Sequence, residues 1–207
     1  MTTARTPRWF ITFQLTMWGL VLGAVAYFLV PAYLPAPVAA ATSLGPGVAL
    51  DGPFRLVNED GQPMTEADFA GKPGVWFYGF MNCPDVCPTA LAEIGTLMGQ
   101  LGSDADKLNA VFVTVDPERD TPELMKAYVD YFDPRIIGLT GDLDEITRMT
   151  AARFVAFEKV PYEDGGYAMQ HPATIYLVRA DGTFAGTLDA EEGMEVKLQK
   201  LQKLVGG

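Results

Sequence analysis

The sequence predicts an α/β domain with a mixed central sheet, preceded by one N-terminal transmembrane helix. Between residues 51 and 207, strand-like apolar runs alternate with helix-like segments, and the order closes with a hairpin and a helix. This order is typical of helices packed on a mixed sheet. A separate run of 22 uncharged residues, 9–30, is long enough to cross a hydrocarbon core of about 30 Å as a helix.

The chain is expected to have four parts: a short cytoplasmic N-terminus (1–8), a transmembrane anchor (9–30), a Pro/Ala/Gly-rich tether (31–50) and a folded domain (51–207). Arg5 and Arg8 precede the span, and no basic residue follows it until Arg55. This bias keeps the N-terminus in the cytoplasm and places the domain outside. The short N-terminus leaves little room for a transit peptide, which favours the inner membrane and periplasm of a bacterium over a mitochondrial intermembrane space.

A cleaved signal peptide is the alternative to the anchor. The small residues of "PVAAATS", around Ala39 to Ala41, resemble a cleavage site. However, the apolar core of a signal peptide usually runs only about 7 to 15 residues, so the longer run favours an uncleaved anchor. In either case the domain is exported, and free thiols there tend to oxidise.

The exported part is acidic. All 26 acidic residues and all but two of the 15 basic residues lie in residues 51–207, and the whole chain carries a net charge of −11. Because nucleic acids are bound mainly through their phosphates by basic surfaces, this composition predicts no nucleic-acid partner.

The first half of the domain begins with a hairpin. "FRLVNEDGQPMT" has two apolar runs around Asp60-Gly61. "GVWFYGF" (74–80) is a continuous aromatic and β-branched run that predicts a buried strand. A helix then follows in which Pro88 occupies the first turn and apolar residues recur at helical spacing up to Leu101.

The second half continues the alternation. It contains a strand (110–115), a helix with Thr121 as N-cap and Pro122 at its first position, a strand (135–140), and a helix preceded by Asp142 and Glu145 in capping-box spacing. "YEDGGYAMQ" (162–170) predicts a flexible loop. Strands at 173–178 and 183–188 form a hairpin around Asp181-Gly182, and an amphipathic helix (191–205) ends the domain.

Both cysteines of the chain, Cys83 and Cys87, lie on the turn between the first long strand and its helix. This placement is that of a thioredoxin-like fold. The unpaired amides and dipole of a helix N-terminus stabilise a thiolate, so the pKa of Cys87 is expected to be lowered.

The pair allows three interpretations: a structural disulfide, a redox pair or part of a metal site. A disulfide here would close a loop of only a few residues and restrain the unfolded chain little. The usual redox spacing is CxxC, whereas this chain has CxxxC. The third interpretation needs another ligand, and His171 is the only histidine.

His171 precedes Pro172, which favours extended backbone, at the entrance of the strand 173–178. In a thioredoxin-like sheet this entrance can lie beside the cysteine turn. Two thiolates and one imidazole suit copper, whereas zinc would normally require a fourth ligand. The donor set therefore favours copper.

Three motifs carry a family resemblance: "GFMNCPDVCP", "FVTVDPERDTPE" and "HPATIYLVRADG". Together they resemble the Sco/SenC family of membrane-anchored copper chaperones that serve the Cu(A) centre of cytochrome c oxidase. The resemblance implies that Cys83, Cys87 and His171 bind one copper ion, as Cu(I) or Cu(II). It also implies that Asp85 and Asp116 shape the site without binding the metal.

The implied partners are the oxidase subunit that carries Cu(A), a periplasmic copper donor and, through the N-terminal helix, the lipid bilayer. Two departures from the family pattern stand out. Met81-Asn82 replaces the Thr-His that often precedes the first cysteine, and Gln170 replaces an acidic residue before the histidine. The second departure removes a carboxylate that could orient the imidazole.

Three functions are compatible with these residues. The first is copper delivery by ligand exchange, a binding role without catalytic turnover. The second is a thiol-disulfide oxidoreductase that reduces the Cu(A) ligand cysteines, in which Cys83 and Cys87 are the redox-active pair. The third, a thiol peroxidase, has no specific support in the sequence. Copper delivery is favoured, because a dithiol reductant has no evident use for His171.

Overall fold

The computed structural model describes residues 17–18, 45, 47–50, 52–163 and 165–206. The chain divides into two units, Met1–Ser43 and Leu44–Gly207, and nearly all the described residues belong to the second. Within the described part of the chain, no helix is both long enough and apolar enough to cross a bilayer. The predicted span 9–30 lies outside the described residues, except for Met17 and Trp18, which are helical and exposed.

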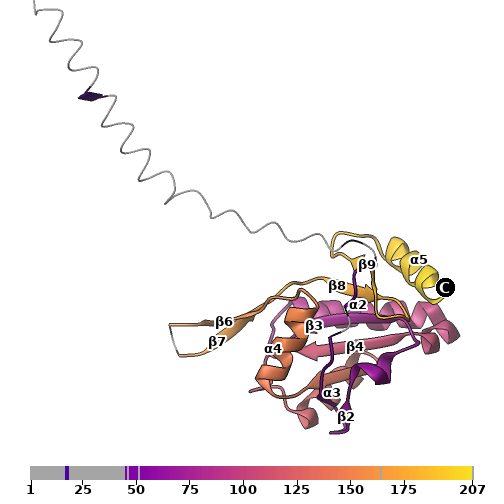
Figure 1. Ribbon diagram of the computed structural model, residues 1–207, viewed down its shortest axis with the longest axis horizontal. Helices are drawn as coiled ribbons and strands as arrows, with labels where there is room; N and C mark the ends of the chain where they lie inside the picture. The colour runs from indigo at the N-terminus through magenta and orange to yellow at the C-terminus, as the bar shows by residue number, and fades with distance from the viewer. Residues whose placement is uncertain (1–16, 19–44, 46, 51, 164, 207) are drawn as a thin grey trace, which may run out of the picture. The chain divides into compact units, whose positions relative to one another are not determined.

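The second unit contains a seven-stranded sheet and a two-stranded hairpin (Figure 1). The elements are β1 (Leu56–Asn58), β2 (Pro63–Met64), η1 (Glu66–Phe69), β3 (Gly74–Gly79), α2 (Val86–Leu101), η2 (Gly102–Lys107), β4 (Asn109–Thr114), α3 (Pro122–Phe132), β5 (Ile136–Thr140), α4 (Leu143–Ala152), β6 (Glu158–Pro161), β7 (Tyr167–Gln170), β8 (Ile175–Val178), β9 (Phe184–Leu188) and α5 (Met194–Val205). The large sheet has the order β2-β1-β5-β4-β3-β8-β9.

The large sheet is mixed, as predicted. β3, β4 and β5 are parallel, whereas β1 pairs antiparallel with β5, and β8 pairs antiparallel with β3 and β9. All residues of β3 and β4 are buried. Their continuous aromatic and β-branched runs reflect this burial, because a central parallel strand is covered by other elements on both faces.

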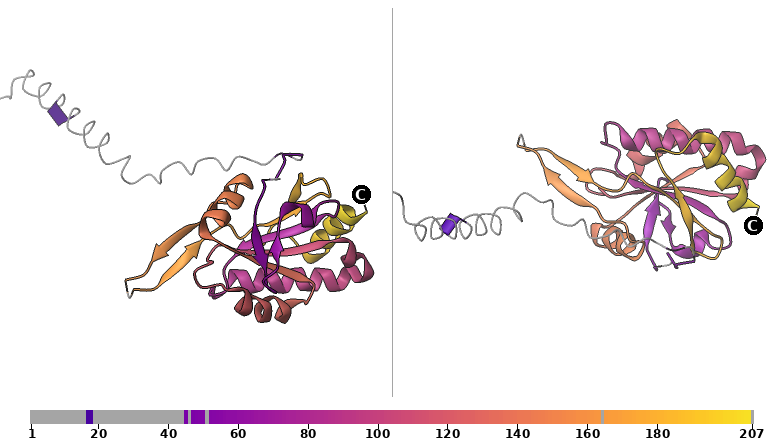
Figure 2. Two further views of the ribbon diagram at one scale, coloured as in Figure 1. Left: turned by 60° about the horizontal axis from the view of Figure 1, so that its bottom comes forward. Right: turned by 90° about the horizontal axis from the view of Figure 1, so that it is seen from above.

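Helices cover both faces of the sheet (Figure 2). On one face, a side chain added at Gly79 would meet Cys87 of α2, and one added at Gly138 of β5 would meet Met125 of α3. On the other face, Arg153 at the end of α4 lies over the ring of Trp76. Since successive residues of a strand point to opposite faces, Phe77 and Gly79 belong to the α2 face and Trp76 to the α4 face.

The folded unit has a hydrophobic core of its own. The core begins at Leu50, which is buried, and ends at Leu201 of α5. The chain before β1 is also attached to the sheet, because Ala49 forms a bridge with Thr183, next to β9. This core makes Leu44–Gly207 a suitable fragment for experiments on the isolated domain.

The predicted hairpins at 54–65 and 173–188 are confirmed, as are the helices predicted within the folded domain 51–207. The loop predicted at 162–170 is wrong in part, because β6 and β7 pair there as a second hairpin. The capping box predicted for α4 is also wrong. Asp142 is the N-cap but makes no side-chain cap hydrogen bond, while Glu145 accepts a hydrogen bond from the backbone N–H of Arg55.

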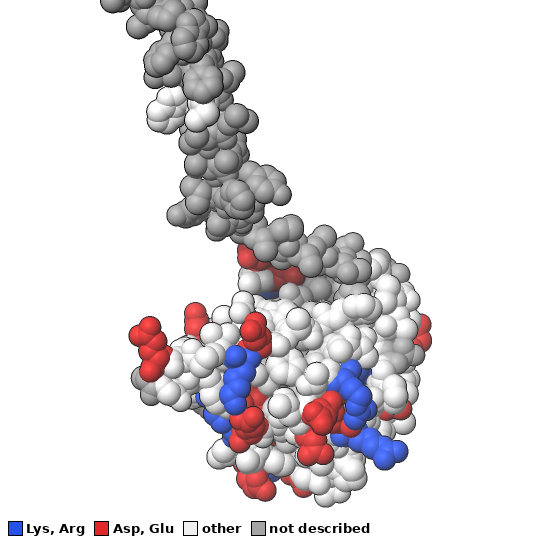
Figure 3. Space-filling view, turned by 60° about the vertical axis from the view of Figure 1, so that its left-hand side comes forward, with Lys and Arg blue, Asp and Glu red and all other residues white. Residues whose placement is uncertain are grey.

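The surface carries several exposed ion pairs. On the face drawn in Figure 3, basic side chains lie beside acidic ones. The exposed ion pairs of the described residues include Lys126 with Asp60 and Lys159 with Glu118, at 2.8 and 2.6 Å. Exposed pairs of this kind contribute little to stability, so they do not explain the fold.

Candidate metal centre

The two cysteines come from the turn that follows β3. This strand ends at Gly79 and α2 begins at Val86, so Cys83 lies in the turn and Cys87 in the first turn of the helix. Cys87 is fully buried, and Cys83 is partly exposed. The backbone N–H of Cys87 lies 3.5 Å from the Cys83 sulfur, and the N–H of Phe80 lies 3.5 Å from the Cys87 sulfur. Both sulfurs therefore face backbone donors.

His171 reaches the cysteines from the opposite side of the site. It follows β7 directly and precedes β8, the neighbour of β3 in the sheet. The imidazole Nε2 lies 3.4 Å from the Cys87 sulfur. Phe77 and Phe80 pack edge-on against the ring, with centroid distances of 6.1 and 5.7 Å. The aromatic contacts hold the ring over the end of β3.

The tautomer of His171 follows from the hydrogen bond made by its second ring nitrogen, Nδ1. Nδ1 lies 2.9 Å from the carbonyl oxygen of Pro172, and because a carbonyl can only accept, Nδ1 must donate. In the neutral ring, Nε2 then presents its lone pair to the cysteines. The backbone carbonyl of Pro172 therefore orients the imidazole ring and fixes its tautomer.

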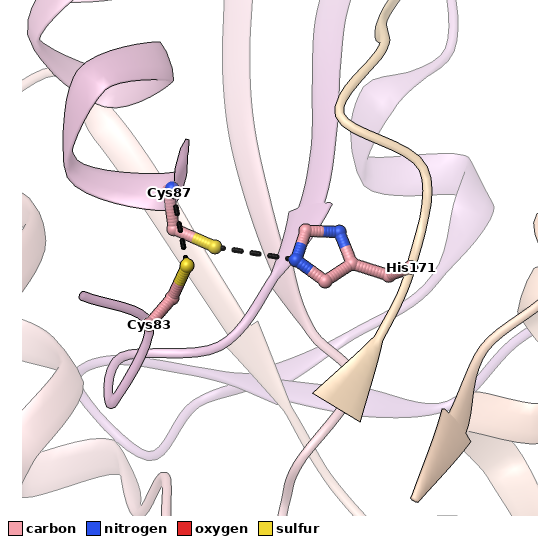
Figure 4. A group of neighbouring side chains, drawn as sticks. All are labelled: Cys83, Cys87 and His171. Carbon is pink, nitrogen blue, oxygen red and sulfur yellow. Dashed lines mark hydrogen bonds between the residues drawn. The ribbon is translucent and has the colours of Figure 1, made fainter. Parts of the chain in front are cut away.

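Three ligand atoms thus converge, as Figure 4 shows. The ligand atoms of Cys83, Cys87 and His171 all lie within 4.8 Å of one another. Within the described part of the chain, this is the one group of three or more cysteine, histidine or acidic side chains that could hold a metal ion. Two soft sulfurs and one imidazole nitrogen at this spacing can surround a single soft metal ion.

The comparisons with known proteins bear directly on this site. The SCO1/SenC family model matches residues 43–206. The chain belongs to the SCO1/SenC family. The resemblance predicted from its three motifs is therefore confirmed.

Solved relatives of this SCO1/SenC chain have the same fold. The structure of Bradyrhizobium japonicum ScoI with copper bound is 43% identical, with a TM-score of 0.70, and the match covers 76% of this chain and 99% of that one. The structure of yeast Sco1 with copper bound is 32% identical, also with a TM-score of 0.70, and the match covers 78% and 90% of the two chains. These structures confirm the predicted thioredoxin-like fold.

Curated relatives include mitochondrial proteins of greater length. Protein SCO2, mitochondrial, of Saccharomyces cerevisiae is 35% identical over 167 residues, which are 76% of this chain and 55% of that protein. The mitochondrial SCO1 homolog of Mus musculus is 37% identical over 138 residues, which are 65% and 49% of the two chains. This SCO1/SenC chain therefore spans about half the length of these relatives.

The electrostatics of the SCO1/SenC site differ from the expectation for a helix N-terminus. Burial raises the pKa of the Cys87 thiol, so the predicted lowering is wrong for the metal-free protein. The sulfur lies in the core beside β3 rather than in water, and the loss of hydration outweighs the hydrogen bond from the backbone N–H of Phe80. Burial also lowers the pKa of His171. A metal ion that binds here must displace the thiol proton.

Asp116 lies near the site but outside the ligand group. Its buried carboxylate accepts hydrogen bonds from Arg119 Nε and, at 2.9 Å, from the hydroxyl of Tyr167. The Arg119 guanidinium lies 3.8 Å from the centroid of the Tyr167 ring. Since Tyr167 belongs to the strand that leads to His171, this cluster fastens the β6–β7 hairpin to the loop after β4.

Asp120 connects the cysteine turn to the end of β4 through hydrogen bonds. It accepts hydrogen bonds from the backbone N–H of Met81 at 3.0 Å and from the hydroxyl of Thr114 at 2.6 Å. Burial raises the pKa of this carboxyl group. Asp85 is different: it is exposed, and its backbone carbonyl, rather than its carboxylate, accepts a hydrogen bond from Thr89.

The sequence did not predict that Arg119 and Tyr167 support the site. Arg119 belongs to the "DPERD" run, whose charges suggest only a solvated loop. Tyr167 lies in the segment expected to be a loop, 51 residues from Asp116. No short sequence pattern links the two positions, so only the folded chain shows their contact.

Proposed function

We propose that this chain binds one copper ion through Cys83, Cys87 and His171 and delivers it to the Cu(A) site of cytochrome c oxidase during assembly. The observation that carries the proposal is the convergence of the three ligand atoms within 4.8 Å. The copper-bound structures of ScoI and yeast Sco1, which share the family and fold, support copper as the metal.

The ligands have properties that suit delivery. Thiolates bind Cu(I) strongly, and a three-ligand site leaves a copper ion open to attack by a further ligand from a partner. Cys83 is the more exposed sulfur and is the natural point of exchange. Transfer by ligand exchange needs no catalytic turnover, so the main role is binding rather than enzymatic.

The partners in this proposal are the oxidase subunit that carries Cu(A) and a periplasmic copper donor. The domain would work in the periplasm, held at the inner membrane by residues 9–30 and the tether 31–50. Membrane attachment is also found in the family, since one solved relative, 26% identical, is a SCO1/SenC family lipoprotein from Bacillus anthracis. Attachment would keep the domain close to a membrane-bound acceptor.

A thiol-disulfide oxidoreductase is the second candidate, and the two free thiols favour it. The sulfurs of Cys83 and Cys87 lie within 4.8 Å of each other on an irregular turn, in which Asp85 has φ −142° and ψ −66°. One thiol could attack a partner disulfide and the other resolve the mixed disulfide. Reduction of the Cu(A) ligand cysteines would then precede copper transfer by the same domain.

The deciding experiment is an anaerobic Cu(I) titration of residues 44–207 and of two variants. The wild-type domain should bind one equivalent of copper. His171→Ala should weaken binding at least tenfold, because it removes one of three ligands, while the exposed neighbour variant Gln170→Ala should bind as the wild type does. Equal affinity of wild type and His171→Ala would contradict the three-ligand site.

The reductase is tested on the same proteins with an oxidised peptide that carries the Cu(A) cysteines. Reduction that proceeds equally fast in wild type and His171→Ala, but is lost in Cys87→Ser, would support the second role. No reduction by the wild type would exclude it. The copper result and the reduction result are independent, so either function can fail alone.

A further inference from the structure

A cavity of about 280 Å³ lies away from the cysteines, at the other end of β3 and β8. Its apolar wall is formed by three aromatic side chains, Phe54, Phe69 and Trp76. The rings pack on one another at centroid distances of 4.9 to 6.4 Å, which makes the wall rigid. The volume is close to the lower end of the usual range for small-molecule sites, so the cavity suits a ligand of about one ring.

Arg153 places a positive charge in this cavity. The residue is 94% buried, at the C-cap of α4. Within the part of the chain that the structure describes, no carboxylate lies within ion-pair distance of its guanidinium. Its one hydrogen bond among these residues, from Nη1 to the carbonyl of Met149, is long at 3.5 Å.

The contacts of Arg153 orient its charge but do not neutralise it. The guanidinium lies 5.1 Å from the ring centroid of Phe54 and 5.5 Å from that of Trp76, within the range of cation–π attraction. The end of α4 also attracts a cation. Neither interaction supplies a negative charge. Together with the hydrogen bond from the backbone N–H of Phe54, the Arg153 charge lowers the pKa of Glu66, which lines the same cavity, but the two side chains do not form an ion pair. Buried charges in proteins are normally paired.

Among the described residues, the rest of the cavity lining is also more basic than acidic. Lys72 and Arg179 join Arg153, against the two described carboxylates, Glu66 and Asp181. Both carboxylates have hydrogen-bond donors of their own: the backbone N–H of Phe54 for Glu66, and the N–H and hydroxyl of Thr183 for Asp181. The described lining therefore has one more basic than acidic side chain, although the chain as a whole has a net charge of −11.

We propose that this cavity binds a small aromatic carboxylate, with the carboxylate on Arg153 and the ring against Phe69 and Trp76. A bidentate pair between guanidinium and carboxylate would supply the missing negative charge. The planar wall would accept the ring by stacked or edge-on contacts. A neutral ring would gain only the second of these interactions.

The cavity is independent of the metal site. Trp76 points to the α4 face of the sheet, whereas the next residue, Phe77, points to the α2 face and contacts His171. Ligand binding to the cavity is therefore expected to persist when the cysteines are replaced. This expectation separates the proposal from copper binding, on which it does not rest.

Trp76 is the only tryptophan in residues 44–207, so its fluorescence reports this cavity in the isolated domain. The domain has its own core, and the ScoI match takes in 99% of a solved chain while covering 76% of this one. We expect benzoate, added to the metal-free domain, to change Trp76 fluorescence saturably. Benzamide, which has the same ring without the charge, should bind at least tenfold more weakly.

The matched variants are Arg153→Gln and Arg148→Gln. Both replace an arginine of the α4 region, but Arg148 is exposed and paired with Glu145. Arg153→Gln should weaken benzoate binding at least tenfold, while Arg148→Gln and the double variant Cys83→Ser/Cys87→Ser should leave it unchanged. Near-ultraviolet circular dichroism checks that each variant is folded, and Lys72→Gln provides a milder test if Arg153→Gln is not.

Several outcomes would overturn the proposal. They are a fluorescence change that does not saturate, benzamide binding as tight as that of benzoate, unchanged binding by folded Arg153→Gln, and loss of binding in the cysteine double variant. If Arg153→Gln does not fold, unchanged binding by Lys72→Gln together with equal benzamide binding counts against it.

Discussion

The candidate metal centre depends on a single glycine, Gly79, at the end of β3. A Cβ at Gly79 would lie 2.7 Å from the Cys87 sulfur, 3.0 Å from Phe77 and 3.2 Å from Phe112. These neighbours are all buried and cannot retreat without repacking the core. The glycine at the end of β3 is therefore what allows the Cys87 sulfur to sit against the strand.

We expect Gly79→Ala to weaken Cu(I) binding at least tenfold, because the methyl group displaces the Cys87 sulfur from His171 Nε2. A competition titration against a Cu(I) chelator measures the effect. Gly99→Ala, at a surface position of α2 with open space around it, is the control and should bind copper normally. Unchanged affinity in Gly79→Ala would show that the sulfur can bind from another position.

Tyr128, which lies near Cys83 and Cys87, has a buried hydroxyl group without a hydrogen-bond partner among the described residues. Its ring packs against Phe112 and Phe132. A buried unpaired hydroxyl costs about 1 to 3 kcal/mol. Tyr128→Phe should therefore raise the free energy of unfolding of the metal-free domain by about 1 kcal/mol in urea denaturation.

Tyr131, on the same helix, provides the comparison. It is 84% exposed, so Tyr131→Phe should change stability by less than about 0.5 kcal/mol. A loss of stability in Tyr128→Phe would mean that the hydroxyl has a partner in solution, such as an ordered water molecule.

Among the secondary-structure elements, the sequence predicted most of the large sheet but not the β6–β7 hairpin, which ends just before His171. β3 and β4 could be predicted because their apolar runs are continuous. The β6–β7 hairpin could not be predicted in this way, because every residue of β6 is exposed and its sequence shows no alternation of apolar and polar residues. The sequence also predicted, by residue type, the three side chains that the structure brings together, whereas the tautomer of His171 depends on a backbone carbonyl.

The β6–β7 hairpin should influence copper binding through its attachment. Tyr167→Phe removes only the hydroxyl that donates to Asp116, and we expect it to raise the dissociation constant for copper about tenfold, since groups that orient ligands commonly contribute 10- to 100-fold. Hydrogen exchange of the amides in 158–170 should become faster.

The control for this change lies in the same hairpin. Tyr162 is 53% exposed, and Tyr162→Phe should alter neither copper binding nor hydrogen exchange. If Tyr167→Phe speeds exchange but leaves copper affinity unchanged, the hairpin does not position His171.

The helices α2 and α3 pack closely at Gly95. A Cβ at Gly95 would lie 2.8 Å from the backbone carbonyl of Phe132, whereas one at Gly99 would meet nothing within 4 Å. Gly95→Ala should destabilise the domain, because the helices must move apart. Gly99→Ala should stabilise it by about 0.5 to 1 kcal/mol through helix propensity.

These two substitutions are chemically identical and one turn apart in α2. If urea denaturation shows that Gly95→Ala lowers the free energy of unfolding while Gly99→Ala raises it, the difference isolates the effect of packing. The same sign for both would show that the close approach of α2 and α3 relaxes at little cost.

At the scale of the whole molecule, the acidic charge and the apolar run occupy different parts of the chain. Residues 1–50 have no acidic residue and only Arg5 and Arg8 as charged side chains, whereas all 26 acidic residues follow. An acidic domain is repelled by anionic membrane surfaces, so its own surface charge would not hold it at a bilayer. The run 9–30, followed by the tether 31–50, would provide the attachment.

We expect the full chain, expressed in a bacterium with periplasmic space, to stay in the membrane fraction after alkaline carbonate extraction. Its mass should be that of the uncleaved chain, because the 22-residue run is longer than the apolar core of a signal peptide. A C-terminal alkaline phosphatase fusion should be active, because the positive charges precede the span. A chain that begins at Leu44 is the soluble control. Recovery of a soluble protein cleaved near Ala39 to Ala41 would instead identify the run as a signal peptide.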